Sequence, residues 1–131
     1  MWTDDYIGIP YCVNGRDRDG IDCYGLIVLV YREQLSVTLP DQTDVVCGSS
    51  ALDIRRARRA IAVGRDVWQR VDDCRPFDVV LLRSGAHIAH VGIVVNRRQM
   101  LHSIGGVATT IEDFTGPLWA HRVEEYRRYV S

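Results

Sequence analysis

The sequence predicts an α+β fold in which N-terminal helices pack on a central antiparallel β-sheet. Two observations lead to this prediction. A continuous apolar run at residues 26–31 follows a polar loop and continues into good helix formers. From residue 76 onward, short apolar runs alternate with short turns, which is the spacing of an antiparallel meander.

The bulk composition limits the class of protein. The chain has 131 residues, 47% of them hydrophobic and 25% charged, so residues 1–131 are expected to form a single ordinary globular domain. A net charge of −1 argues against nucleic acid as the main partner. No apolar stretch approaches the roughly 20 residues needed to cross a bilayer. Residues 1–5 lack the apolar core of a signal peptide, so synthesis in the cytoplasm and another export route are expected.

The first part of the chain is expected to deliver one buried helix. Residues 6–11 form an extended or turn segment, because Pro10 excludes a helix interior. Residues 14–20 form a polar loop bounded by glycines. The following run is predicted to be helical, although periodicity alone also fits a buried strand. Residues 36–49 are expected to be an irregular surface connection.

Residues 50–63 are predicted to form an amphipathic helix. Ser50 can cap its start, and Gly64 suits its C-terminal end. Its apolar side chains fall on one face and its arginines largely on the other. A charged helix face of this kind is more often exposed to solvent than part of a polyanion-binding site. We therefore expect a solvated face for its four arginines: Arg55, Arg56, Arg58 and Arg59.

The second part of the chain reads as strands. They are expected at residues 78–83, 90–95, 99–104 and 107–111. Residues 119–129 supply a last strand, although their charged residues fit a helix equally well.

Cys23 is the leading candidate for a reactive group. It lies in residues 20–26 (GIDCYGL), where the predicted helix begins. The positive end of a helix dipole and an adjacent imidazolium both favour a thiolate, which is the reactive form of cysteine. No C-x-x-C pair occurs among Cys12, Cys23, Cys47 and Cys74, so a zinc ribbon or a thioredoxin-type motif is disfavoured. The thiols are expected to be reduced, with one reactive member.

His90 and His102 are the candidate partners of this thiol. If their strands pair across a turn centred on residue 96, the two histidines lie directly opposite each other on one face. One imidazole can then act as a base for Cys23 while the other orients it. Histidine suits this task because it titrates near neutral pH.

Other interpretations of these residues remain open. His90 and His102 can be ordinary strand histidines, with Cys23 a small core residue. His87 can replace His90 as the base but lacks a paired partner, and His121 is expected at the surface. The thiol and the two imidazoles can also ligate zinc, but no fourth ligand is evident.

In this order, the motifs resemble those of NlpC-type cell-wall cysteine peptidases. The resemblance covers nearly the whole chain and is greatest to the short, stand-alone members found in phage tails and phage-derived gene clusters. It rests on the YIGIPY run at residues 6–11, the DCYGL run at residues 22–26, Pro76-x-Asp78, the HVGIVV run at residues 90–95, and His102.

The resemblance implies a papain-like fold and hydrolysis of the γ-D-glutamyl–diamino acid bond of peptidoglycan stem peptides. Cys23 is then the nucleophile, His90 the base and His102 the orienting third residue. Tyr11 corresponds to the family tyrosine whose hydroxyl faces the sulfur and helps to hold the oxyanion. Asp22 is a candidate for binding the free amine of the stem-peptide alanine.

The chain departs from the family pattern at two positions. Tyr24 stands where the family usually has serine, and it is expected to reshape the substrate cleft. The usual Pro-Gly-Asp is Pro76-Phe77-Asp78 here. No cofactor or metal is expected. The expected partners are the stem peptide and proteins of a phage tail or similar particle, which would carry the enzyme to the cell wall or periplasm.

Two other functions use the same motifs. A structural tail or scaffold protein would keep the fold, lose catalysis and bind wall peptides or partner subunits. A related amidase or acyltransferase would use the same cysteine and histidine pair on a different bond.

Overall fold

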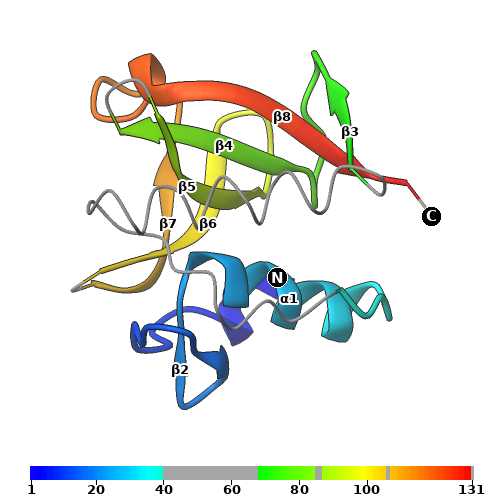
Figure 1. The fold of residues 1–131 in the computed structure, drawn as a ribbon, viewed down its shortest axis with the longest axis vertical. Helices are drawn as coiled ribbons and strands as arrows, with labels where there is room; N and C mark the ends of the chain where they lie inside the picture. Colours follow the sequence, from blue (N-terminus) through cyan, green and yellow to red (C-terminus); the bar gives the residue numbers. More distant parts are fainter. Residues whose placement is uncertain (40–67, 85–86, 106, 131) are drawn as a thin grey trace.

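The computed structural model describes residues 1–39, 68–84, 87–105 and 107–130. In these residues one α-helix lies against a six-stranded antiparallel sheet, beside a small two-stranded sheet (Figure 1). The elements are η1 (Trp2–Asp5), β1 (Arg16–Asp17), β2 (Gly20–Ile21), α1 (Cys23–Gln34), β3 (Trp68–Val71), β4 (Val79–Ser84), β5 (His87–Val94), β6 (Gln99–Ile104), β7 (Val107–Asp113), η3 (Ala120–Arg122) and β8 (Val123–Tyr129). The predicted α+β fold is confirmed. The predicted helix at residues 50–63 lies outside the described residues.

Helix α1 begins at Cys23 because Asp22 caps it. Asp22 has an extended backbone, and its carboxylate accepts a hydrogen bond of 2.7 Å from the N–H of Gly25. Every residue from Cys23 to Tyr31 is buried. This explains why the run is apolar throughout instead of amphipathic, since a helix covered on all sides has no polar face.

The strands lie in the order β3-β8-β4-β5-β6-β7. Strands β4 to β7 form the predicted meander, and β8 returns to pair with the other side of β4. The strand alternative for the end of the chain is therefore confirmed. Strand β3 at the sheet edge was not predicted, because exposed Gln69 and Arg70 fill the middle of its four residues.

The β5–β6 hairpin differs in register from the prediction. Ile93 pairs with Leu101, so position 102 falls opposite Gly92 and not opposite His90. The predicted direct pairing of His90 with His102 was wrong by two residues. Because side chains alternate with a period of two, the two histidines still share one face as diagonal neighbours.

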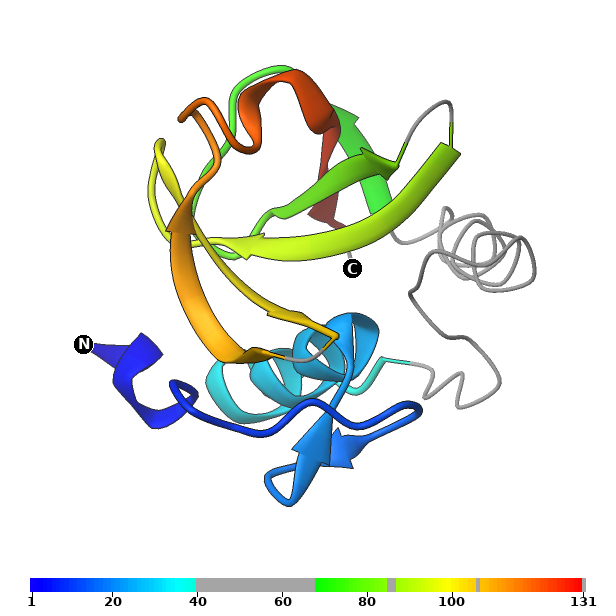
Figure 2. The ribbon, with the colours of Figure 1, turned by 90° about the vertical axis from the view of Figure 1, so that its left-hand side faces the viewer.

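The segment before α1 is joined to the sheet. The predicted loop at residues 14–20 carries most of the short β1–β2 hairpin. Beside that hairpin, the hydroxyl of Ser103 in β6 donates a 3.0 Å hydrogen bond to the carbonyl of Ile21. Thr109 of β7 exchanges two backbone hydrogen bonds of 2.9 Å with residues 8–9. The start of α1 is thereby fixed under β6 and β7 (Figure 2).

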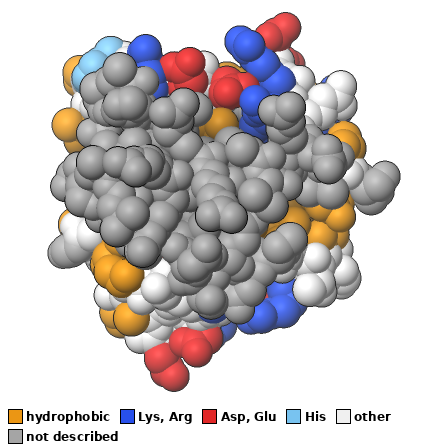
Figure 3. Space-filling view, viewed as in Figure 1, with side chains coloured by type: hydrophobic (Ala, Val, Ile, Leu, Met, Phe, Trp, Pro, Cys, Tyr) orange, Lys and Arg blue, Asp and Glu red, His pale blue; other side chains and the backbone are white. Residues whose placement is uncertain are grey.

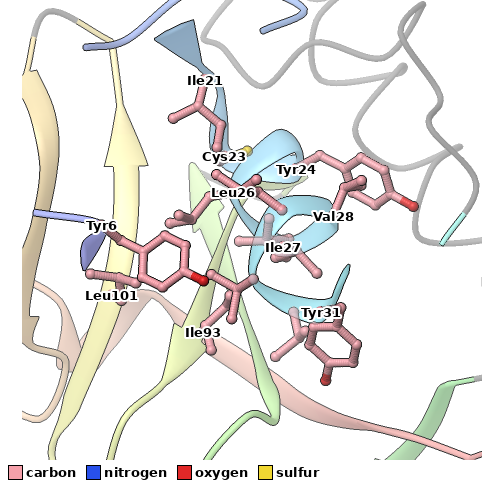
Figure 4. Close-up of a cluster of buried hydrophobic side chains, with 14 of the residues drawn as sticks. Tyr6, Ile21, Cys23, Tyr24, Leu26, Ile27, Val28, Tyr31, Ile93 and Leu101 are labelled. Carbon is pink, nitrogen blue, oxygen red and sulfur yellow. The ribbon is translucent and has the colours of Figure 1, made fainter. Parts of the chain in front are cut away.

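Apolar side chains cover both faces of the sheet. The larger cluster lies between α1 and the sheet and includes Val79 and Leu81 of β4 (Figure 4). The alternate residues of the same strand, Val80 and Leu82, belong to a second cluster that contains Trp119. Trp119 of this second cluster also contacts His90 and His102.

Charged side chains of β8 are paired at the surface. Figure 3 shows arginine and acidic side chains along the upper edge of the molecule, where β4 and β8 lie, and others along its lower edge. Arg83 and Glu124 are 3.1 Å apart, and Arg127 and Glu125 are 3.0 Å apart. None of the described helices has the length and apolarity that a membrane span requires.

Candidate active site

Cys23 is the first residue of α1, and only 1% of it is exposed. Its sulfur lies at the N-terminal end of the helix, near Ile21 (Figure 4). The positive end of the helix dipole is at this end and favours an anionic sulfur. The structure holds Cys23 in a disulfide, whereas Cys12 and Cys74 are free. The expectation of reduced thiols is therefore wrong for Cys23, and thiolate chemistry requires reduction of this bond.

The two predicted histidines are hydrogen-bonded to each other. His90 Nε2 lies 2.8 Å from His102 Nδ1, and both residues are buried. Gly92 permits this approach, since a Cβ atom there would lie 3.4 Å from the Cβ of His102 and 2.9 Å from the sulfur of Met100. The structure therefore brings the two imidazoles together, although they are not direct cross-strand partners.

The helix that carries the cysteine packs on the strands that carry the histidines. Helix α1 contacts both β5 and β6. The hydrogen bond from Ser103 to Ile21 joins the residue after His102 to a residue two positions before Cys23. The start of α1 is thus held against the strand that carries His102.

Glu112 extends the histidine pair and was missed by the sequence reasoning. Its Oε2 lies 2.5 Å from His102 Nε2. In the β6–β7 pairing Met100 faces Glu112 and His102 faces Thr110, so His102 and Glu112 are diagonal neighbours on one face. The available signal in the sequence was a carboxylate ten residues after His102, beyond the Gly105-Gly106 pair.

Trp119 covers the two imidazoles and was also missed. Its ring centroid lies 5.9 Å from that of His90 in a stacked arrangement and 5.2 Å from that of His102 in an edge-to-face arrangement. The Arg122 guanidinium lies 4.4 Å from the indole centroid. The indole forms an apolar wall that keeps water away from the histidines, which strengthens the hydrogen bonds between them.

Burial keeps both imidazoles neutral. Burial, with smaller contributions from the neighbouring His102 and Arg122, lowers the pKa of His90 to about 3. Burial also lowers the pKa of His102, while the hydrogen bond and charge of Glu112 act in the opposite direction. These values belong to the disulfide form, which offers no thiolate. A thiolate beside His90 would favour the imidazolium.

Tyr11 lies beside the segment that leads into α1. It forms an isolated parallel bridge with Ile21, two residues before Cys23. On its other side, a Cβ atom at Gly105 would lie 3.9 Å from two carbons of the Tyr11 ring. The phenol therefore lies between the segment that leads into α1 and the end of β6.

Asp22 is fully buried, and its carboxylate already has three donors. These are the backbone N–H of Gly25 at 2.7 Å, the guanidinium of Arg16 at 2.8 Å and the backbone N–H of Asn14 at 3.1 Å. The contacts make Asp22 a helix cap and an anchor for the preceding loop. Its predicted contact with a substrate amine stays a prediction.

Tyr24 is 8% exposed and lies on the sheet side of α1, with the guanidinium of Arg16 5.5 Å from its ring centroid. It lines an apolar pocket whose other residues come from α1 and four strands: Ile27, Trp68, Val79, Leu81, Val91 and Arg127. The predicted substrate contact of Tyr24 stays a prediction.

The structure leaves few free donor atoms for the alternative in which Cys23, His90 and His102 bind zinc. Three of the four ring nitrogens of His90 and His102 are engaged with each other or with Glu112. In the described part of the chain, no three histidine, cysteine or acidic side chains are grouped as metal ligands would be. His121 is exposed in η3, as expected, and His87 is the first residue of β5.

The model of the NlpC/P60 family matches residues 8–128. The chain belongs to this family. NlpC/P60 is a family of cysteine peptidases, so the predicted class of enzyme is confirmed at that level. The family match does not distinguish the phage-tail members, so the resemblance to that subgroup stays a prediction.

Relatives and solved structures agree with this assignment. Over 127 residues the chain is 29% identical to the murein DD-endopeptidase MepS/murein LD-carboxypeptidase of Escherichia coli (strain K12), covering 97% of this chain and 59% of that protein. It is 26% identical to the γ-DL-glutamyl hydrolase of Bacillus subtilis (strain 168), covering 97% of this chain and 28% of that protein. The chain thus spans only part of both relatives.

The fold matches two solved NlpC/P60 structures. The NlpC/p60 domain of the peptidoglycan hydrolase SagA superposes with a TM-score of 0.64 at 17% identity, covering 96% of this chain and 92% of that domain. An NlpC/P60 family protein from Bacillus cereus ATCC 10987 superposes with a TM-score of 0.69 at 19% identity, covering 98% of this chain and 38% of that chain. At these identities the matches establish the papain-like fold.

Proposed function

We propose that this protein is a peptidoglycan endopeptidase that hydrolyses the γ-D-glutamyl–diamino acid bond of stem peptides. The observation that carries the proposal is the 2.8 Å hydrogen bond between His90 and His102 on strands packed against the cysteine-bearing helix. Acyl transfer by a thiol requires a base beside the cysteine and a group that orients the base, and the proposal gives these roles to His90 and His102. The relatives named as a murein endopeptidase and a γ-DL-glutamyl hydrolase support the choice of substrate.

In the reduced enzyme, His90 Nδ1 accepts the thiol proton of Cys23, and the thiolate attacks the γ-glutamyl carbonyl carbon. The tetrahedral intermediate collapses with cleavage of the C–N bond, and the His90 imidazolium protonates the leaving amine. His90 then takes a proton from water, which attacks the thioester, releases the γ-carboxylate and restores the thiol. The backbone N–H of Cys23 and the Tyr11 hydroxyl hold the oxyanion, each contributing about 3–4 kcal/mol.

The remaining substrate contacts follow from the resemblance to the family. Asp22 is assigned to the free amine of the stem-peptide alanine, where that amine would compete with Arg16 for the carboxylate. Tyr24 replaces the small residue usual in the family and is assigned to shape the cleft beside the nucleophile. Residues 1–131 are assigned to one catalytic domain.

A phage tail or similar particle is the proposed carrier of this domain to the cell wall. The support is the resemblance of residues 6–11 to stand-alone phage-derived members of the family. Co-purification of the chain with assembled particles would support this carrier. Recovery of the active chain from a cell envelope that contains no particle would contradict it.

The central test is replacement of the nucleophile. In the presence of a reductant, Cys23→Ala is expected to abolish release of peptides from purified peptidoglycan, because no other group on α1 can form the acyl-enzyme. Circular dichroism checks that the fold is retained. Cys12→Ala and Cys74→Ala are matched controls that change free cysteines and should leave hydrolysis intact.

The outcomes separate the competing functions. Continued digestion by Cys23→Ala would contradict the thiol mechanism. An inert wild-type enzyme, with Cys23 alkylated by iodoacetamide no faster than Cys12, would favour the structural tail protein. Mass analysis of products from defined stem peptides distinguishes the γ-D-glutamyl endopeptidase from a related amidase or acyltransferase.

A further inference from the structure

The His90–His102 pair ends at a carboxylate that the mechanism above does not use. His102 Nε2 and Glu112 Oε2 are 2.5 Å apart. His102 is fully buried, whereas the Glu112 side chain is 33% exposed. Three groups from three neighbouring strands therefore form one line, His90 on β5, His102 on β6 and Glu112 on β7, running from the buried site toward solvent.

The acceptor chemistry of Glu112 determines which ring nitrogens of His102 and His90 donate and which accept. A carboxylate oxygen can only accept a hydrogen bond, so His102 Nε2 must carry a proton. His102 Nδ1 is then a lone pair in the neutral ring, and it must accept from His90 Nε2–H. His90 Nδ1 is thereby left as the lone pair of its ring. That nitrogen is the only one in the pair able to take a proton from a thiol.

We propose that Glu112 is a positioning residue of the catalytic site, which sets the tautomers of His102 and His90 so that His90 Nδ1 is the proton acceptor. Without this acceptor, either nitrogen of His102 can carry the proton. When His102 carries it on Nδ1, His90 Nε2 must accept, and His90 presents an N–H in place of a lone pair. The inference rests on the proposed thiol mechanism.

Glu112 also balances the charges around the pair. The charged or titratable groups that face His102 are His90 from β5, Glu112 from β7 and Arg122 from η3. Arg122 disfavours the imidazolium in both rings, whereas Glu112 favours it in His102. Removal of the Glu112 charge leaves burial and the charge of Arg122 to act together against the imidazolium. The thiolate–imidazolium pair should therefore form only at higher pH.

The test compares Glu112→Gln, which is isosteric, with Asp113→Asn. The control removes the same charge from the adjacent residue, whose carboxylate pairs with exposed Arg98. In Glu112→Gln, kcat/KM on stem peptides is expected to fall between about tenfold and a hundredfold. The pH midpoint of Cys23 alkylation by iodoacetamide is expected to rise by about one unit. Asp113→Asn should change neither quantity, and equal effects in both variants would overturn the inference.

A second measurement does not depend on activity. Long-range ¹H–¹⁵N correlation spectra of the reduced wild-type protein report the tautomer of each histidine. Both His90 and His102 are expected as Nε2–H tautomers at pH 7, and His102 should become a mixture in Glu112→Gln. A wild-type His102 with its proton on Nδ1 would overturn the inference. Correct tautomers in a protein that hydrolyses no stem peptide would instead overturn the proposed function.

Discussion

His90 and His102 are buried imidazoles, and this has a consequence for stability in acid. In the folded protein, burial lowers both pKa values below the ordinary value of 6.5. In the unfolded chain the same rings protonate as pH falls through about 6.5. The unfolded state then binds more protons than the folded state. Stability contributed by the neutral rings is therefore complete above this pH and is lost as pH falls toward the folded pKa values.

The first prediction measures this loss for one histidine. Each neutral histidine should make the free energy of unfolding fall by up to about 1.4 kcal/mol per pH unit below 6.5. His90→Gln removes one such histidine. The slope of the unfolding free energy against pH should therefore be smaller by about 1.4 kcal/mol per pH unit between roughly pH 6 and pH 4, which lies below the unfolded pKa. Urea unfolding of wild type, His90→Gln and the exposed control His121→Gln gives the three slopes. An unchanged slope in His90→Gln would show that His90 is protonated in the folded state.

At the scale of elements, the turn before β4 holds an unusual residue. Phe77 has φ of +73°, in the left-handed region that glycine adopts without strain. Glycine would adopt this backbone conformation without strain, whereas the Cβ atom of Phe77 makes it costly. The Phe77 ring stacks on Trp2 at a centroid distance of 4.7 Å and an interplanar angle of 26°. We infer that this contact with the N-terminal segment offsets the backbone strain.

A double-mutant cycle tests that inference. Phe77→Gly should cost more stability in the wild type than in a Trp2→Ala background, because only the wild type has a ring contact to lose. The coupling free energy is expected to be about 0.5–1.5 kcal/mol. Guanidinium unfolding of the four proteins provides it. Strictly additive costs would mean that the ring contact does not support the turn.

The elements that the sequence predicted correctly are those with strong local signals. Helix α1 follows an aspartate cap and a continuous apolar run, and the meander has a turn between each pair of apolar strands. The failures have non-local causes. The register of the β5–β6 pair depends on the conformation of the turn between these strands. The sequence does not give that conformation, so the predicted pairing of His90 with His102 was wrong by two residues. Glu112 contacts His102 because β6 pairs with β7, and Trp119 contacts both histidines because the chain folds back over the sheet. A local sequence pattern predicts neither contact.

At the scale of the whole molecule, the proposed active site is assembled at the boundary between two layers. The proposed nucleophile belongs to α1 in the lower layer of Figure 1, and the histidines belong to the sheet above it. Ser103 crosses this boundary next to His102, and its hydroxyl donates to Ile21 just before Cys23. Both partners are buried. The position of the thiol relative to the imidazoles should therefore depend on this single side-chain hydrogen bond.

Ser103→Ala tests this dependence. The free energy of unfolding should fall by only about 1 kcal/mol, because the Ile21 carbonyl keeps the Cys12 N–H as a donor at 3.1 Å. The kcat/KM on stem peptides should fall further than that loss explains, by about tenfold or more, since small displacements of reacting groups are costly. Urea unfolding and product assays on the folded variant separate the two effects, with the exposed Thr38→Ala as a control. Full activity in Ser103→Ala, with or without a loss of stability, would mean that backbone pairing of residues 8–9 with Thr109 is enough to align the two layers.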